Sequence, residues 1–267
     1  MKKWIYRIIQ AILILIILFC GYQIGSYYWQ RYQSDKSYEN LAEELDLQTE
    51  PTSDTSNDAT PEVPDYEGIM AKLLAKNEDT VAYLEILGTK NAYPVMQAED
   101  NDFYLRRGFD KADNIQGSLF MDYVNKPNLS DQNTVIYGHT MNQGDAMFGI
   151  FKHFYEQEYV DRSEKAFRLF KQDGIYYYRI FSVYRVPADA LYRVPNVEPE
   201  AWVQFLEDTR AQSEANFGWD KPFVASDRVV TLSTCTDDHN SDYRTAIVGI
   251  LEKVVTKTGV QEYLTDR

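Results

Sequence analysis

An apolar run near the N-terminus is the strongest hydrophobic feature of the chain. Residues 8–30 carry no charged side chain and include the segment AILILIILF, while Lys2, Lys3 and Arg7 precede it. A helix of this length, at about 1.5 Å per residue, crosses the roughly 30 Å hydrocarbon layer of a membrane. Aromatic residues, rather than a small-x-small cleavage site, follow the run, which favours an uncleaved anchor over a signal peptide. We therefore expect residues 1–30 to be a cytoplasmic tip and a single transmembrane segment, with the rest of the chain outside the cell.

Two segments of different character follow the apolar run. Residues 37–47 (SYENLAEELDL) have helical character, whereas residues 48–64 are rich in Ser, Thr, Asp, Glu and Pro and carry almost no apolar side chains. A segment of the second kind buries too little apolar surface to order itself. We expect residues 31–64 to form an extracellular stalk that holds a folded domain, residues 65–267, away from the membrane. A long surface loop within one fold is the alternative, which is less favoured because no folded element precedes it.

Three further segments are predicted to form helices with one apolar face. Residues 65–76 place apolar side chains at i, i+3 and i+4 and begin with Asp65, a suitable N-cap. Residues 145–155 carry Met, Ile and Phe side chains for a buried face. Residues 198–216 begin with Pro199 in the first turn and with acidic side chains that suit the positive end of a helix.

Short apolar runs separated by turn residues fill the rest of the chain. They are residues 81–87, 92–97, 118–121, 134–137, 166–170, 175–186, 228–233 and 245–255. Runs of this length, bounded by Gly, Asn and Pro, predict β-strands. About eight strands joined mostly by short loops predict a mainly β fold in which the sheet closes, or nearly closes, into a barrel.

Composition and charge narrow the classes of partner. The aromatic content of 14%, with 21 Tyr, supplies ample material for a core and excludes overall disorder. A net charge of -14 excludes nucleic acid as a partner, since phosphate binding needs a surface rich in Lys and Arg. The two cysteines, Cys20 in the apolar run and Cys235, exclude a disulfide framework. A single thiol outside the membrane segment has two interpretations, an inert buried cysteine or a reactive site.

Cys235 lies where a predicted buried strand ends and a polar loop begins. A thiolate nucleophile needs a histidine or a cation nearby, because a free thiol is mostly protonated at neutral pH. His139 also follows a strand-like run, NTVIYGH, so it is the better candidate base. His239, in the polar loop after Cys235, is the second candidate, and His153 is expected to be a structural or surface residue.

Arg244 opens the next predicted strand, nine residues after Cys235. A guanidinium is a permanent cation with a fixed fork of donors, which suits an oxyanion or a substrate carbonyl. Pairing with Asp237, Asp238 or Asp242 is the alternative. Zinc would need three or four ligands at a recognisable spacing, and the chain also lacks a Gly-rich phosphate loop and a CxxC pair. We therefore expect no metal and no cofactor.

These motifs resemble a known family. TLSTC at residues 231–235 and VIYGHTM at residues 135–141, with Arg244 at the head of the next strand, resemble the sortases, the cysteine transpeptidases of Gram-positive cell surfaces. The resemblance spans about residue 77 to the C-terminus. The TLSTC form, the helix before the barrel and the long helix over residues 198–216 are similar to class B. The resemblance implies an eight-stranded sortase-like β-barrel with N-terminal helices and a long helix inserted before the cysteine strand.

The resemblance also implies roles for individual residues. Cys235 would be the nucleophile, His139 the general acid and base, and Arg244 the residue that stabilises the oxyanion and positions the substrate. Thr234 and Ser233 would help to orient the substrate.

The implied reaction is a two-step acyl transfer. Cys235 attacks the Thr carbonyl of a C-terminal sorting signal on an exported protein, His139 protonates the leaving amine, and a thioester forms. An amine from a peptidoglycan precursor or from a pilin then resolves the thioester. Two other functions stay open from the residues: an extracellular cysteine protease that hydrolyses the same type of thioester, and a non-enzymatic barrel that binds a ligand at the cell surface.

Overall fold

The predicted apolar runs form strands. The computed structural model describes residues 2–45, 63–140, 144–235 and 242–264. The strands are β1 (Thr80–Ile86), β2 (Ala92–Met96), β3 (Leu119–Met121), β4 (Asn133–Tyr137), β5 (Ala166–Lys171), β6 (Gly174–Pro187), β7 (Val229–Cys235), β8 (Tyr243–Thr256) and β9 (Gly259–Glu262). The helices are α1 (Lys2–Glu44), α2 (Tyr66–Lys76), α3 (Gln157–Arg162) and α4 (Pro199–Ala211), with 3-10 helices η1 (Phe103–Leu105) and η2 (Gly149–Tyr155).

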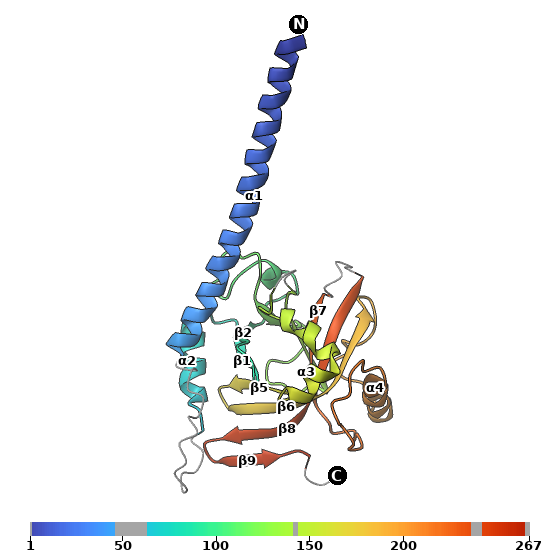
Figure 1. Ribbon diagram of the computed structural model, residues 1–267. Coiled ribbons are helices and arrows are strands. Elements are labelled where there is room, and N and C mark those ends of the chain that lie inside the picture. The colour runs from blue at the N-terminus through green and yellow to red at the C-terminus, as the bar shows by residue number, and fades with distance from the viewer. Residues whose placement is uncertain (1, 46–62, 141–143, 236–241, 265–267) are drawn as a thin grey trace.

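The strands close into a barrel (Figure 1). In the described part of the chain their order is β6-β5-β1-β2-β3-β4-β7-β8-β9, and a further β6–β8 pairing joins the two sides of the sheet. Strands β1 to β8 therefore form the predicted eight-stranded barrel, and β9 forms a hairpin with β8. β4 and β7 are parallel neighbours, whereas β7 and β8 are antiparallel. β4 and β7 consequently end at the same end of the barrel, where β8 begins.

Hydrophobic clusters lie on both sides of the sheet. Alternate strand residues such as Leu84, Ile136 and Leu232 are almost fully buried and fill the barrel interior. On the outer side, α4 packs through Trp202 and Leu206 against residues of β6, β7 and β8. The predicted long helix before the cysteine strand is thus present, and it covers the outer face of the strands that lead to the site.

The other predicted helices differ in how closely the structure follows them. Asp65 accepts a hydrogen bond from Gly68 N at 3.1 Å, which confirms it as the N-cap of α2. The predicted helix over residues 145–155 is instead the 3-10 helix η2, followed by the short α3. Met147 has a φ of 52°, and this left-handed conformation is incompatible with a continuous α-helix through residues 145–155.

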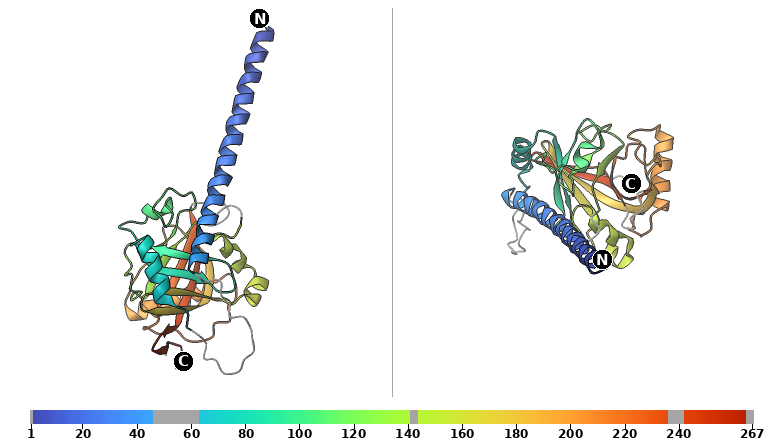
Figure 2. Two further views of the ribbon diagram at one scale, coloured as in Figure 1. Left: turned by 90° about the vertical axis from the view of Figure 1, so that its left-hand side faces the viewer. Right: turned by 90° about the horizontal axis from the view of Figure 1, so that it is seen from above.

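Helix α1 continues past the apolar run, and its last turns pack against the barrel (Figure 2). Tyr38, Leu41 and Leu45 are at most 6% exposed. Leu41 and Leu45 contact α2, β1 and β5 in one apolar cluster, so this end of the helix has a buried face. Residues 31–44, at the start of the predicted stalk, are therefore helical and docked. Residues 46–62 lie outside the described residues, and the division into anchor, stalk and folded domain stays a prediction.

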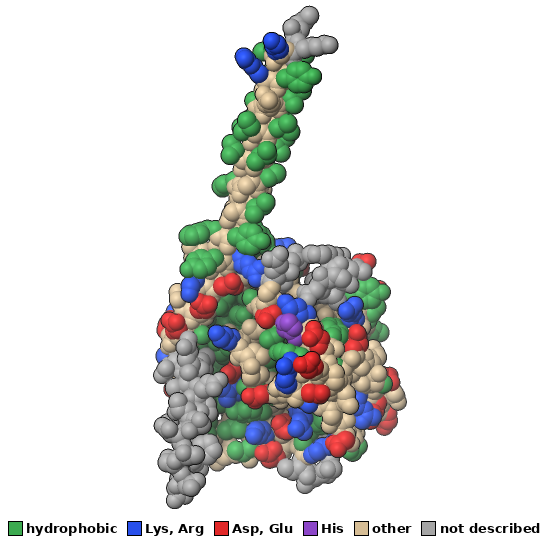
Figure 3. Space-filling model, in the orientation of Figure 1, with side chains coloured by type: hydrophobic (Ala, Val, Ile, Leu, Met, Phe, Trp, Pro, Cys, Tyr) green, Lys and Arg blue, Asp and Glu red, His purple; other side chains and the backbone are tan. Residues whose placement is uncertain are grey.

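The projecting part of α1 is apolar and exposed. Among the described helices, α1 is long and apolar enough by length and composition to cross a membrane, and its apolar stretch is not buried against the rest of the protein. Figure 3 shows hydrophobic side chains along this part, whereas charged side chains are spread over the barrel. The end of the barrel where β7 ends and β8 begins points to the same side as the projecting helix (Figures 1 and 2).

Candidate active site

Strand pairing brings two of the predicted site residues together. β7 and β8 are antiparallel neighbours, and Cys235 at the end of β7 is the register partner of Arg244 in β8. β4 lies on the other side of β7 and pairs with it up to Tyr137, which is opposite Ser233. The end of β4, the end of β7 and the start of β8 therefore form one edge of the barrel.

His139 lies beside the residues that precede Cys235. Gly138 N donates a hydrogen bond to Ser233 O at 3.1 Å, and Thr140 Oγ1 lies 2.7 Å from Thr234 Oγ1. The two neighbours of His139 in the chain thus contact the last two residues before Cys235. The parallel pairing explains this placement, since parallel neighbours present their carboxyl ends at the same edge of a sheet.

The imidazole of His139 is half-buried and held by a backbone carbonyl. Its Nε2 lies 2.8 Å from Leu105 O. A carbonyl only accepts hydrogen bonds, so Nε2 carries the proton and Nδ1 is the unprotonated nitrogen of the neutral ring. Burial lowers the pKa of His139 below its ordinary value of 6.5, the Leu105 hydrogen bond raises it, and the nearby Arg106 charge lowers it. The net direction favours a neutral imidazole at neutral pH.

Arg244 is half-buried at the start of β8. Its Nη1 donates to Tyr243 O at 2.8 Å. Of the alternative partners of this residue, Asp237, Asp238 and Asp242, the first two lie outside the described residues. The pairing of Arg244 with Cys235 places a permanent cation at the strand position opposite the predicted nucleophile.

Ser233 and Thr234 are both buried, and their hydroxyls make contacts within the protein. Ser233 Oγ lies 2.9 Å from Tyr192 OH, and Tyr192 O accepts a hydrogen bond from Asn133 Nδ2 at 2.9 Å. Residues 188–198, which connect β6 to α4, are therefore fixed against β4 and β7. Thr234 makes the contact with Thr140 described above. The Ser233 hydroxyl thus connects β7 to residues 188–198, and the Thr234 hydroxyl connects β7 to the segment that follows β4.

The other two histidines are His153 and His239. His153 Nε2 is 3.1 Å from Asp145 Oδ1, which also accepts from Lys152, so His153 lies in a partly exposed polar cluster, consistent with the structural or surface residue that was expected. His239 lies outside the described residues. Across the part of the chain that the structure describes, no three His, Cys, Asp or Glu side chains are grouped so that they could hold a metal ion.

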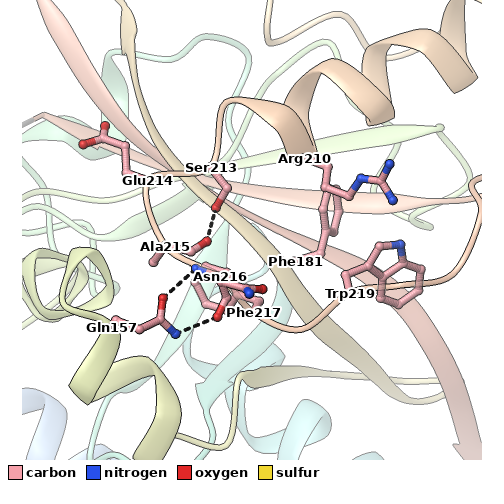
Figure 4. Close-up of a pocket in the computed structure, with 9 residues that line it drawn as sticks. All are labelled: Gln157, Phe181, Arg210, Ser213, Glu214, Ala215, Asn216, Phe217 and Trp219. Carbon is pink, nitrogen blue, oxygen red and sulfur yellow. Dashed lines mark hydrogen bonds between the residues drawn. The ribbon is translucent and has the colours of Figure 1, made fainter.

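A separate cavity of about 300 Å³ lies over β6, between α3 and α4 (Figure 4). Its lining is formed by Gln157, Phe181, Arg210, Ser213, Glu214, Ala215, Asn216, Phe217 and Trp219. None of the predicted site residues belongs to this lining. The cavity is therefore distinct from the edge formed by β4, β7 and β8.

Sequence reasoning missed two partners of the site. Leu105 contacts His139 through its backbone oxygen, which no side-chain pattern could reveal. Tyr192 comes from an irregular connection, and one Tyr among 21 carries no signal of its own.

Comparison with known proteins gives one family. A model of the sortase domain matches residues 84–252. Sortase B of Staphylococcus aureus (strain NCTC 8325 / PS 47) is 28% identical over 249 residues, which cover 93% of this chain and 96% of that protein. Sortase B of Listeria monocytogenes serovar 1/2a (strain ATCC BAA-679 / EGD-e) is 29% identical over 259 residues, which cover 96% of this chain and 99% of that protein.

Solved structures of the same class share the fold. A Staphylococcus aureus sortase B–substrate complex superposes with a TM-score of 0.70 at 26% identity, covering 85% of this chain and 99% of that one. Clostridium perfringens sortase B gives a TM-score of 0.63 at 30% identity, covering 68% of this chain and 98% of that one. The residues matched by the family model are more than half of the chain and run from β1 into β8. The chain therefore belongs to the sortase family, in its class B, and is a sortase-type cysteine transpeptidase.

Proposed function

We propose that this transpeptidase cleaves a C-terminal sorting signal after a Thr residue and transfers the acyl group to an amine of the cell wall or of a pilin. The observation that carries the proposal is the register pairing of Cys235 with Arg244, at the edge where β4 delivers His139. Pairs in a strand ladder share a face, so positions 235 and 244 belong to the same face of the barrel. A nucleophile, a cation and an imidazole at one edge are the groups that acyl transfer through a thioester needs.

In the first step, the Cys235 thiol loses its proton to His139 Nδ1, and the thiolate attacks the Thr carbonyl. Arg244 stabilises the negative oxygen of the tetrahedral intermediate. The imidazolium then gives its proton to the leaving amine, the C–N bond breaks, and a thioester remains. Because burial lowers the pKa of His139, its protonated form is a stronger acid than an ordinary imidazolium and transfers this proton readily.

In the second step, an amine attacks the thioester and passes a proton to His139. The C–S bond breaks, a new amide forms, and the thiolate of Cys235 recovers the proton. Staphylococcus aureus sortase B has been solved with a substrate, and a sortase B structure has been solved with triglycine, a peptide that begins with a primary amine. Those complexes support a sorting-signal donor and an amine acceptor for this chain as well.

Ser233 and Thr234 are proposed to shape the substrate site rather than to react. Their hydroxyls attach Tyr192 and Thr140 to β7, so they fix the two segments that flank Cys235. A substrate bound at this edge would lie against those segments.

The proposed location is the outer surface of the cell membrane. Residues 8–30 would span the bilayer, with the basic N-terminal tip in the cytoplasm and the barrel outside. The candidate site lies at the end of the barrel that faces the projecting part of α1, which would place it toward the membrane (Figure 1). Exported proteins whose C-terminal signals are still in the membrane would reach this end directly.

The function is tested on the full chain in detergent micelles, with a library of fluorogenic peptides that carry Thr at the scissile position. We expect cleavage of a subset of peptides, and loss of cleavage in Cys235→Ala and His139→Ala. Addition of triglycine should convert the cleaved peptide to a ligated product, measured by mass spectrometry. Cleavage retained by Cys235→Ala would exclude the mechanism. Water as the sole acceptor at saturating triglycine or hydroxylamine would instead identify a cysteine protease.

A further inference from the structure

We propose that the docked end of α1, acting through residues 103–118, positions the imidazole of His139. Residues 103–118 form the Leu105 segment. The inference rests on the proposed catalytic role of His139 and adds a positioning role for residues that precede the barrel. It assigns that role to Tyr38 of α1 and to Gly117 of the Leu105 segment.

The imidazole of His139 contacts the Leu105 segment directly. His139 Nε2 donates to Leu105 O at 2.8 Å. An imidazole with one nitrogen held by a fixed acceptor keeps both its tautomer and the direction of its other nitrogen. A displacement of the Leu105 carbonyl would therefore change the direction of His139 Nδ1, the nitrogen that the mechanism uses.

Gly117 packs directly against the Leu105 carbonyl. Gly117 has a φ of +60°, and a Cβ atom there would lie 2.6 Å from both Leu105 O and Tyr104 O. Ser118 N donates to Tyr104 O at 3.0 Å, and Ser118 Oγ donates to Arg107 O at 2.9 Å. The two ends of the Leu105 segment are thus in direct backbone contact, at a distance that only a glycine allows.

Helix α1 contacts Gly117 and Ser118. Tyr38 OH donates to Gly117 O at 3.0 Å and lies 3.2 Å from Ser118 Oγ. One turn earlier, Ser34 Oγ donates to Gln116 Oε1 at 2.9 Å. Tyr38 is 6% exposed, and burial raises the pKa of its hydroxyl, which stays protonated and able to donate. One face of α1 therefore fixes residues 116–118.

The end of α2 also contacts the segment. Asn77, the C-cap of α2, donates through Nδ2 to Tyr104 OH at 2.9 Å and to Phe109 O at 2.7 Å. Tyr104 OH in turn donates to Asp79 Oδ2 at 2.6 Å. Tyr104 directly precedes Leu105, so both N-terminal helices constrain the backbone that holds the imidazole. These helices precede residues 84–252, to which the sortase family model is matched.

The sharpest test compares Gly117→Ala with Gly218→Ala in the full chain. Both glycines have positive φ, +60° and +73°, so alanine strains the backbone in a similar way at either position. At Gly218 the new Cβ meets nothing within 4 Å, whereas at Gly117 it displaces the Leu105 carbonyl. We expect kcat of Gly117→Ala to fall about tenfold or more below that of Gly218→Ala, with KM changed by less than about twofold. Equal kcat values in the two variants would overturn the proposal.

A conservative variant tests the contribution of α1 without a clash. Tyr38→Phe removes the hydroxyl donor and keeps the aromatic packing, and Tyr32→Phe is the matched control on the exposed part of the same helix. We expect Tyr38→Phe to lower kcat about fivefold with little change in KM, and Tyr32→Phe to match the wild type. Thermal unfolding of each variant separates lost positioning from lost folding. An unchanged kcat in Tyr38→Phe would exclude the role assigned to α1.

His139→Ala distinguishes this inference from the proposed function. If His139→Ala keeps full activity, the catalytic assignment fails. If His139→Ala is inactive while Gly117→Ala and Tyr38→Phe match their controls, the catalytic assignment stands and the positioning role fails.

Discussion

Thr140 and Thr234 meet hydroxyl to hydroxyl at 2.7 Å, and this contact joins the residue after His139 to the residue before Cys235. Neither side chain is a candidate for the chemistry itself. Their contact is nevertheless the shortest described path between the predicted base and the predicted nucleophile. It adds a side-chain contact to the backbone pairing that holds the ends of β4 and β7 together.

Replacement of Thr234 by Val should lower the rate of thioester formation. The variant keeps the volume of the buried side chain but removes the hydrogen bond to Thr140, which is worth about 1 kcal/mol. We expect kcat to fall about tenfold, because the hydroxyl contact no longer helps to fix the position of His139 relative to Cys235. Single-turnover kinetics with a cleavable peptide measure the effect. Thr231→Val is the control, because the Thr231 hydroxyl donates a hydrogen bond to Asn133 Oδ1 (2.8 Å) and lies further from the end of β7. A similar loss of kcat in Thr231→Val would contradict the prediction.

Replacement of Arg244 by Lys should reduce activity strongly although the charge is retained. A lysine ammonium lacks the planar fork of donors that a guanidinium presents to an oxyanion. We expect kcat/KM to fall about 100-fold or more, the usual loss when one oxyanion donor is removed. Arg179→Lys, on an exposed position of β6, is the matched control. Wild-type kcat/KM in Arg244→Lys would assign Arg244 a purely electrostatic role.

His139 should make the protein less stable in acid. Its pKa is lowered in the folded state, so the unfolded chain binds more protons once the pH falls below about 6.5. The buried neutral ring therefore costs no stability above that pH, and the free energy of unfolding falls progressively as the pH drops below it. We expect the difference in unfolding temperature between pH 7.5 and pH 5.5 to be smaller in His139→Gln than in the wild type. Equal differences would show that burial does not depress the pKa of this imidazole.

Tyr192 and Ser233 should be coupled in substrate binding. Their hydroxyls lie 2.9 Å apart and attach residues 188–198 to β7. We expect Tyr192→Phe and Ser233→Ala each to raise KM severalfold, and the double variant to show a coupling energy of about 1 kcal/mol. A double-mutant cycle on KM and on unfolding temperature measures it. Strictly additive effects would mean that the contact does not organise the substrate site.

The barrel could be predicted from the sequence because each of its strands buries at least one face. The runs at residues 134–137 and 228–233 are rich in β-branched and apolar residues, and they correspond to β4 and β7. β9 (Gly259–Glu262) was not predicted, because all four of its residues are exposed and no apolar pattern marks it. The predicted helix over residues 145–155 was wrong in type, since the left-handed Met147 is a property of the tertiary structure and not of local periodicity.

The candidate site was predictable in part for a similar reason. Cys235 and His139 follow predicted strands, and only the sheet order, which periodicity does not give, makes those strands neighbours. The Leu105 carbonyl precedes His139 by 34 residues and is a backbone atom, so it has no signature in the sequence. The docking of residues 31–44 was also missed, because a few apolar side chains in a polar segment indicate weak helical character rather than a packing face.

Helix α1 runs without a break from its apolar part to the turns that pack against the barrel. With residues 8–30 in a bilayer, as proposed, the continuous helix would restrict the rotation of the barrel relative to the membrane. The end of the barrel that carries the candidate site would then stay at a constant distance from the lipid surface. Donor proteins held in the same lipid sheet would then meet the enzyme by lateral diffusion, a search in two dimensions rather than three. The encounter rate would depend on surface density, so cleavage of lipid-tethered donors should rise as the vesicle area shared by enzyme and donor is reduced.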